Sequence, residues 1–187
     1  MELCRILRED KVIMAVKDDK KLEEALKSTK RTVFLLKSDI MTVGDVVKKC
    51  KDAGKTVFIH LDLMDGIGKD ESGLKFLIKN IKPDGIISTK VNIIKLANAL
   101  GLQTVFRVFL IDSQGMESAF HTLTKINPDA VEIMPGVMPE ITRKFATRFA
   151  NLITGGMVSD VNQAKGALDN GAIGVSTSSE VLWNEKF

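Results

Sequence analysis

Short apolar runs alternate with amphipathic stretches along the whole chain, and this alternation limits the fold more than any other feature. The first run, 12–16 (VIMAV), lies between charged residues and is typical of a buried strand. The next stretch, 20–28 (KKLEEALKS), has the apolar spacing of a helix and follows two acidic residues. The same unit recurs to the end of the chain. It predicts eight strands at residues 12–16, 32–36, 56–63, 84–89, 103–111, 130–134, 151–154 and 173–176.

A helical segment follows each predicted strand, around residues 20–28, 42–51, 74–79, 92–100, 116–126, 139–149, 161–168 and 181–182. Neighbouring parallel strands need crossover connections, so strict strand–helix alternation predicts a parallel sheet. Eight units favour closure into a (β/α)8 barrel of the TIM type over an open doubly wound sheet. Such barrels usually need about 200 residues or more. At 187 residues the loops must therefore be short, and with no linker in the sequence we expect one domain over residues 1–187.

The composition is that of an ordinary globular protein inside the cell. Apolar residues make up 44% of the chain and charged residues 27%, which argues against disorder. A net charge of +3 is too small to indicate nucleic-acid binding. Cys4 and Cys50 lack metal or redox spacing and are expected to be buried thiols. With no apolar stretch long enough for a signal peptide or a membrane span, we expect a cytoplasmic protein without membrane contact or bound metal.

Polar residues at the predicted strand ends mark the place where a barrel of this kind binds its ligand. Side chains alternate along a strand, so His60 and Asp62 should point into the barrel mouth, on the same face as Phe58. The same reasoning places further polar side chains at the mouth: Lys17, Lys37, Ser88, Lys90, Arg107 and Glu132. Four of these residues are cations and two others at the mouth are acids, and such a surplus of positive charge in a concave site attracts anions. The alternative is a set of internal salt bridges with no ligand.

The loops after the last two predicted strands are suited to phosphate. Gly155 and Gly156 follow the seventh strand, and Ser176, Thr177 and Ser178 follow the eighth. Many barrels hold phosphate with these two loops, through backbone N–H groups and a short helix. Glycine allows close approach of the backbone, and hydroxyls add donors. A glycine-rich stretch at 65–70 fits neither an EF-hand nor a P-loop, and is interpreted as either a mobile lid or a long turn.

Several stretches together resemble one family, the glycerol-3-phosphate-responsive antiterminators of bacterial glycerol uptake operons. They come in the order and spacing of that family and cover most of the chain after residue 55. The stretches are HLDLMDGIGKD (60–70), PDGIISTK (83–90), FRVFLIDS (106–113), PDAVEIMPGVMP (128–139), LITGGMV (152–158) and GVSTSSEVLW (174–183). Residues 1–50 resemble the family more by layout than by distinctive motif.

The resemblance implies a compact barrel that binds glycerol 3-phosphate as its effector, uses no other cofactor, and acts on the leader mRNA of a glycerol operon. The phosphate-loop pattern of the family falls on Gly155, Gly156, Ser176, Thr177 and Ser178. Its polar strand-end positions fall on His60, Asp62, Lys90, Arg107 and Glu132. On the regulatory hypothesis Lys90 and Arg107 hold the phosphate together with the two loops, and Asp62, Glu132 and His60 take the glycerol hydroxyls. RNA binding rests on the resemblance alone, because the chain has no tyrosine, one tryptophan and no pattern of a known RNA-binding module. A homodimer is a further hypothesis.

Two other functions compete with a regulatory, non-enzymatic protein. The first is an enzyme, of lyase or isomerase type, acting on a small phosphorylated substrate. Asp62, Glu132 or His60 would then be the acid or base, and Lys90 or Lys17 could form a Schiff base if buried. The second is a barrel that serves only as a scaffold and has no affinity for phosphate.

Overall fold

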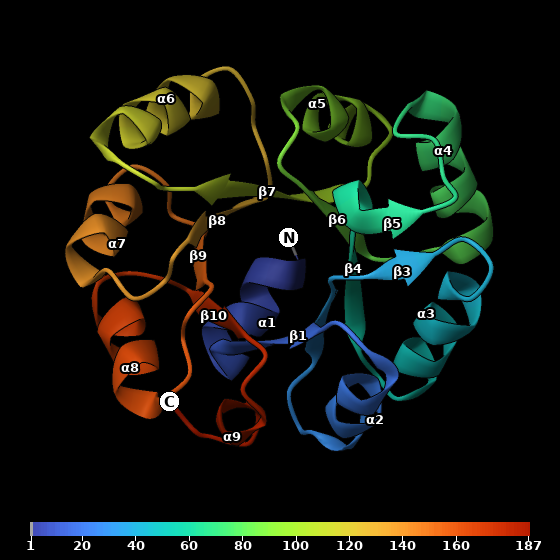
Figure 1. The fold of residues 1–187 in the computed structure, drawn as a ribbon, viewed down its shortest axis with the longest axis horizontal. Helices are drawn as coiled ribbons and strands as arrows, with labels where there is room; N and C mark the ends of the chain where they lie inside the picture. Colours follow the sequence, from blue (N-terminus) through green and yellow to red (C-terminus); the bar gives the residue numbers. More distant parts are fainter. Residues whose placement is uncertain (1) are drawn as a thin grey trace.

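A computed structural model describes residues 2–187 and shows a closed barrel of eight parallel strands (Figure 1). The strands follow one another around the barrel in the order β1-β10-β9-β8-β7-β6-β4-β2, so each strand pairs with its neighbour in sequence and the last closes on the first. This confirms the predicted (β/α)8 barrel. The strands are β1 (Val12–Val16), β2 (Thr32–Leu35), β4 (Thr56–His60), β6 (Gly85–Ser88), β7 (Gln103–Phe109), β8 (Ala130–Met134), β9 (Leu152–Gly155) and β10 (Gly174–Thr177).

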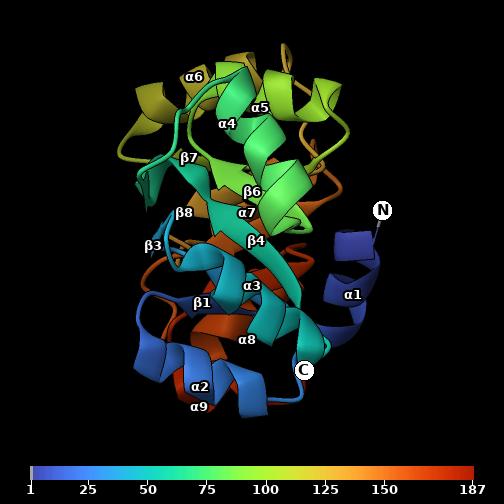
Figure 2. The same cartoon turned by 90° about the vertical axis from the view of Figure 1, so that its right-hand side faces the viewer.

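Helices surround the barrel and cover the outer faces of its strands (Figures 1 and 2). Four of them begin with an aspartate whose side chain accepts a hydrogen bond from a backbone N–H of the first turn: Asp18, Asp70, Asp112 and Asp160. The outer helices are α2 (Asp19–Lys27), α3 (Val43–Asp52), α4 (Glu71–Phe76), α5 (Val91–Ala99), α6 (Ser113–Leu123), α7 (Pro139–Ala146), α8 (Val161–Asp169) and α9 (Glu180–Trp183). Helix α4 continues into a π-helical stretch, η2 (Leu77–Ile81). No helix in residues 2–187 has the length and apolarity needed to span a bilayer.

Helix α1 (Glu2–Asp10) lies outside the repeating unit and was not predicted. Its buried residues Leu3, Cys4 and Leu7 pack with the interior side chains near the strand N-termini, among them Ile13 and Phe34. Figure 2 shows α1 at the end of the barrel opposite β3 (Ser38–Asp39). The helix therefore closes the floor of the barrel.

Two very short strands lie at the other end. β3 pairs with β5 (Met64–Asp65), which follows a 3-10 turn, η1 (Leu61–Leu63). Met64 is fully buried and its carbonyl accepts a hydrogen bond from Lys69 Nζ. The predicted strand 56–63 is therefore too long: it ends at His60, and the glycine-rich stretch after it runs from β5 to the N-terminus of α4.

Candidate functional site

A cavity of about 290 Å³ opens at the carboxyl ends of the strands, between the loops that follow β9 and β10. It combines serine and threonine side chains, a glycine and a few apolar side chains. The lining residues are Ala15, Leu36, Met134, Gly156, Met157, Val158, Ser159, Ser176, Thr177, Ser178 and Ser179. Four of the five residues expected in the phosphate loops line this cavity, and the fifth, Gly155, lies directly beneath it at the end of β9.

Glycine is required at two adjacent positions, Gly155 at the end of β9 and Gly156 after it, for two different structural reasons. Gly156 has φ of +73°, a backbone conformation that favours glycine. At Gly155 space is the limit, because a Cβ there would lie 2.5 Å from Glu132 Oε1 and 2.9 Å from Met134 Cε. Gly155 thus lets the Glu132 carboxylate and the Met134 side chain approach the backbone of β9.

Hydrogen bonds join the two loops to each other. Thr177 Oγ1 donates to the carbonyl of Val158 over 2.6 Å, and Ser179 Oγ donates to the carbonyl of Ser159 over 3.0 Å. Trp183 in α9 donates from Nε1 to the carbonyl of Thr177 over 2.8 Å. The Thr177 hydroxyl is thus used to fix the loop, and the exposed Ser178 lies at the cavity edge.

A buried ion pair lies beneath the cavity. Arg107 of β7 and Glu132 of β8 are opposite each other in register, and Arg107 Nε lies 2.7 Å from Glu132 Oε2. Within residues 2–187 the second oxygen of the pair, Glu132 Oε1, has no hydrogen-bond partner, and neither has Arg107 Nη2 or His60 Nδ1. Burial and the positive charge of Arg107 lower the pKa of His60 from 6.5 to about 4, so its imidazole is neutral at pH 7. Buried polar atoms normally have a hydrogen-bond partner, so these three atoms are free to bond a ligand or a water molecule that enters the barrel.

Asp62 lies in η1, beyond the end of β4, where the strand alternation assumed for it no longer applies. It accepts hydrogen bonds from Ser88 Oγ (2.8 Å), from the Thr89 backbone N–H (2.7 Å) and from Thr89 Oγ1 (2.9 Å). Burial opposes ionisation of this carboxyl, but these donors outweigh it and hold the pKa of Asp62 below its ordinary value. Asp62 therefore fixes the start of α5 to η1.

The predicted direction of Ser88 is wrong. Its neighbour Ile87 packs in the barrel interior, whereas Ile86 packs in the outer cluster, so Ser88 shares the outward face of Ile86. Lys90 is exposed and lies beyond β6, at the N-cap of α5, outside the cavity lining.

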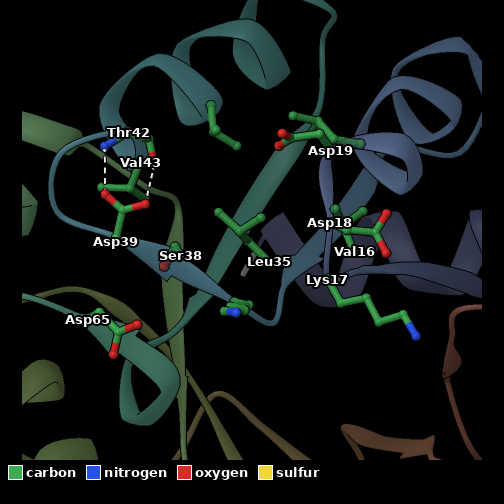
Figure 3. A pocket seen from close by; sticks show the side chains of 13 residues that line it. Val16, Lys17, Asp18, Asp19, Leu35, Ser38, Asp39, Thr42, Val43 and Asp65 are labelled. Carbon is green, nitrogen blue, oxygen red and sulfur yellow. Dashed lines mark hydrogen bonds between the residues drawn. The ribbon is translucent and has the colours of Figure 1, made fainter.

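The prediction for Lys37 is wrong for the same reason. Phe34 of β2 and Leu36, the residue after the strand, face the interior, and Leu36 lines the cavity in place of Lys37. Lys17 and Lys37 line a different cavity of about 200 Å³ between α2 and α3, together with Asp18, Asp19, Asp39 and Asp65 (Figure 3). Figure 3 shows Lys17 extending away from Asp39 and Asp65. The expected ring of four cations at one mouth is therefore not formed: Arg107 alone of them is in the barrel interior, and it is paired.

Sequence reasoning missed seven residues of the cavity lining, among them the apolar residues Ala15, Leu36 and Met134 at the strand ends. Each of these three lies on the interior face of its strand, and Met134 lies two residues beyond Glu132. Strand alternation could have found Ala15 and Met134, because they share the parity of Lys17 and Glu132.

The fold and the cavity define a (β/α)8 barrel with a small polar ligand site between the loops after its last two strands. The family described as glycerol-3-phosphate responsive antiterminator matches residues 12–183. The chain therefore belongs to the glycerol-3-phosphate responsive antiterminator family.

Similar proteins cover nearly the whole chain. The uncharacterized protein YgcP of Escherichia coli (strain K12) is 37% identical over 184 residues, which are 98% of this chain and 96% of that protein. The glycerol uptake operon antiterminator regulatory protein of Listeria monocytogenes is 32% identical, with a TM-score of 0.87 over 92% of this chain and 94% of that one. A glycerol uptake operon antiterminator-related protein of Thermotoga maritima is 34% identical, with a TM-score of 0.83 over 94% and 98%. Deoxyribose phosphate aldolase of Aeropyrum pernix, at 14% identity and a TM-score of 0.68, shares the fold alone.

Proposed function

We propose that this protein senses glycerol 3-phosphate at the barrel mouth and, when loaded, binds the leader mRNA of a glycerol operon to allow transcription past a terminator. Binding of glycerol 3-phosphate is supported by the cavity between the two hydrogen-bonded loops. Beneath it lie buried polar atoms that have no partner within residues 2–187. Membership of the family supports the regulatory half.

In this proposal the phosphate lies against Gly156, Ser176 and Ser178, where backbone N–H groups and hydroxyls can donate. The glycerol end points down the barrel, toward Glu132 Oε1, His60 Nδ1 and Arg107 Nη2, which have no hydrogen-bond partner within residues 2–187. A cavity of about 290 Å³ suits a ligand of this size. Lys90 would act only through its charge at a distance.

Met134 would have to move for the ligand to reach Glu132. Its methyl group and Glu132 Oε1 both lie against Gly155, and its side chain lines the cavity above the ion pair. An unbranched thioether side chain changes rotamer at little cost, so Met134 can give way to a ligand.

Calorimetric titration with glycerol 3-phosphate, with glycerol and inorganic phosphate as controls, tests the ligand half. We expect saturable binding that prefers glycerol 3-phosphate. Ser178→Asp, which places a negative charge at the exposed cavity edge, should weaken binding at least tenfold, whereas Ser118→Asp on the outer surface of α6 should not. No binding of any of the three compounds would refute the sensor and support the scaffold hypothesis.

One observation supports the enzyme hypothesis: His60 is buried and neutral, and the positive charge of Arg107 helps to lower its pKa. Following glycerol 3-phosphate by phosphorus NMR during prolonged incubation separates the two functions. An unchanged spectrum with saturable binding supports the sensor, and conversion to a new phosphate ester supports the enzyme.

A leader-RNA binding assay with and without glycerol 3-phosphate tests the proposed regulatory function. Sedimentation of the free protein tests the homodimer.

A further inference from the structure

Positive charge is unevenly distributed over the outer surface of the barrel. Residues 72–101 contain five lysines and a single acid, Asp84, whereas residues 155–187 contain four acids and two lysines. Asp84 is already used, because it accepts from Lys51 Nζ over 3.0 Å and from the Val57 backbone N–H over 2.8 Å. The segment 72–101 therefore has a local positive charge that the small net charge of the chain conceals.

Four of these lysines lie on, or directly after, two helices that contact each other. Lys75 and Lys79 are one helical turn apart on α4 and η2, Lys82 follows at the end of η2, and Lys95 is on the exposed side of α5. Helices α4 and α5 pack side by side, and Figures 1 and 2 show them as neighbours on one side of the barrel. We call the exposed surface of these two helices the α4–α5 face.

The lysines of the α4–α5 face differ in whether a carboxylate neutralises them. Lys75 pairs with Glu71. In the part of the chain that the structure describes, Lys79, Lys82 and Lys95 have no ion-pair partner, although all three are exposed. Their charge is therefore available to an anionic partner.

An aromatic ring accompanies these lysines. Phe76 is 38% exposed, the only aromatic residue among the exposed large apolar side chains of the outer helices in residues 2–187. It precedes Lys79 by three residues, and the exposed Asn80 lies one turn after it. Lysines that contact phosphates, beside a ring on which a base can stack, are the chemistry by which proteins bind single-stranded nucleic acid.

We propose that the α4–α5 face is the surface that binds single-stranded RNA, with Lys79, Lys82 and Lys95 on the phosphates and Phe76 against a base. This inference rests on the proposed function for the identity of the nucleic acid. The second basic group, Arg143, Lys144 and Arg148 at the end of α7, fits less well. Arg148 stacks over Phe120, with its guanidinium carbon 4.0 Å from the ring centroid, and Glu140 lies in the same helix.

The test compares two charge reversals of equal size in the full-length protein. Lys79→Glu/Lys95→Glu changes the α4–α5 face, and Arg143→Glu/Lys144→Glu makes the same change in net charge on α7. Binding of labelled leader RNA, in the presence of glycerol 3-phosphate, is measured at several salt concentrations. We expect the first variant to lose on the order of tenfold or more in affinity and its salt slope to fall by about 1.4, while the second variant stays within about threefold of the unchanged protein. Phe76→Leu, which keeps the apolar volume, should lose on the order of tenfold with an unchanged salt slope.

Four outcomes would overturn the assignment. Equal losses of RNA affinity in the two charge-reversal variants would show that the RNA is attracted nonspecifically. A larger loss of affinity in the α7 variant would place the RNA-binding site on α7. Loss of antitermination by the Lys79→Glu/Lys95→Glu variant with unchanged RNA affinity would assign the face to an acidic protein partner. If the unchanged protein binds no RNA although it binds glycerol 3-phosphate, the regulatory half of the proposed function fails as well. Calorimetric binding of glycerol 3-phosphate confirms that each variant is folded.

Discussion

Arg107 Nε and Glu132 Oε2 lie 2.7 Å apart in the barrel interior, and the two side chains are 4% and 0% exposed. Removing one member leaves the other as a buried, uncompensated charge, which costs about 3–5 kcal/mol. We therefore expect Arg107→Met to lower the free energy of unfolding by about that amount, and Arg107→Met/Glu132→Leu to recover most of it. Denaturant unfolding of the single and double variants measures both effects. A double variant no more stable than Arg107→Met would contradict this account.

The two glycines after β9 should respond differently to alanine. A methyl group at Gly155 would collide with Glu132 Oε1 and Met134 Cε, so Gly155→Ala should displace the carboxylate and weaken ligand binding. At Gly156 the neighbouring Met134 atoms are at ordinary contact distance, and the cost of alanine is backbone strain of about 1–2 kcal/mol in the left-handed conformation. Calorimetry and thermal unfolding show which of the two variants loses more ligand affinity and more stability. A greater loss of stability and affinity for Gly156→Ala would show that strain, not space, is decisive.

His60 should make the protein less stable in mild acid. Its folded-state pKa of about 4 is below the ordinary 6.5, so the unfolded chain binds this proton more readily than the folded protein. The contribution of His60 to the free energy of unfolding is therefore fully present above pH 6.5. It is lost as the pH falls from 6.5 toward 4, by up to about 3 kcal/mol. His60→Gln should remove this part of the pH dependence, which chemical denaturation at a series of pH values measures. An imidazole of His60 that titrates near 6.5 by NMR would refute the prediction.

Trp183 should report ligand binding by its fluorescence. It is the one tryptophan of the chain, it is buried, and its Nε1 donates to the carbonyl of Thr177 in the loop that lines the cavity. A ligand that moves this loop changes the environment of the indole, so emission should shift as glycerol 3-phosphate is added. The midpoint should match the calorimetric Kd. A signal without saturation would argue against binding at this loop.

The barrel could be predicted from the sequence because each of its units repeats the same local pattern. The interior direction of side chains could be predicted only where a strand has a polar residue on one face, as at His60, Arg107 and Glu132. Near the end of β2 the residues of both faces are apolar, and on β6 the one polar side chain, Ser88, lies on the outward face, so alternation gave no correct signal at Leu36 or Ile87. Lys37 and Ser88 were misplaced for this reason.

Other parts of the structure depend on contacts that are distant in sequence. The pairing of the two-residue strands β3 and β5 joins segments more than twenty residues apart, and no local sequence pattern predicts it. Helix α1 differs, because Leu3, Ile6 and Leu7 have helical spacing and could have been recognised. Its position at the floor could not, since nothing in a single helix says which end of a barrel it covers.

The closed floor has a kinetic consequence. With α1 across one end and side chains filling the interior, the barrel is a cup, and a small molecule can enter or leave only through the mouth. Any partner that covers the mouth would then block escape of the bound molecule, and residence time would lengthen even where the contacts of the molecule itself stay the same.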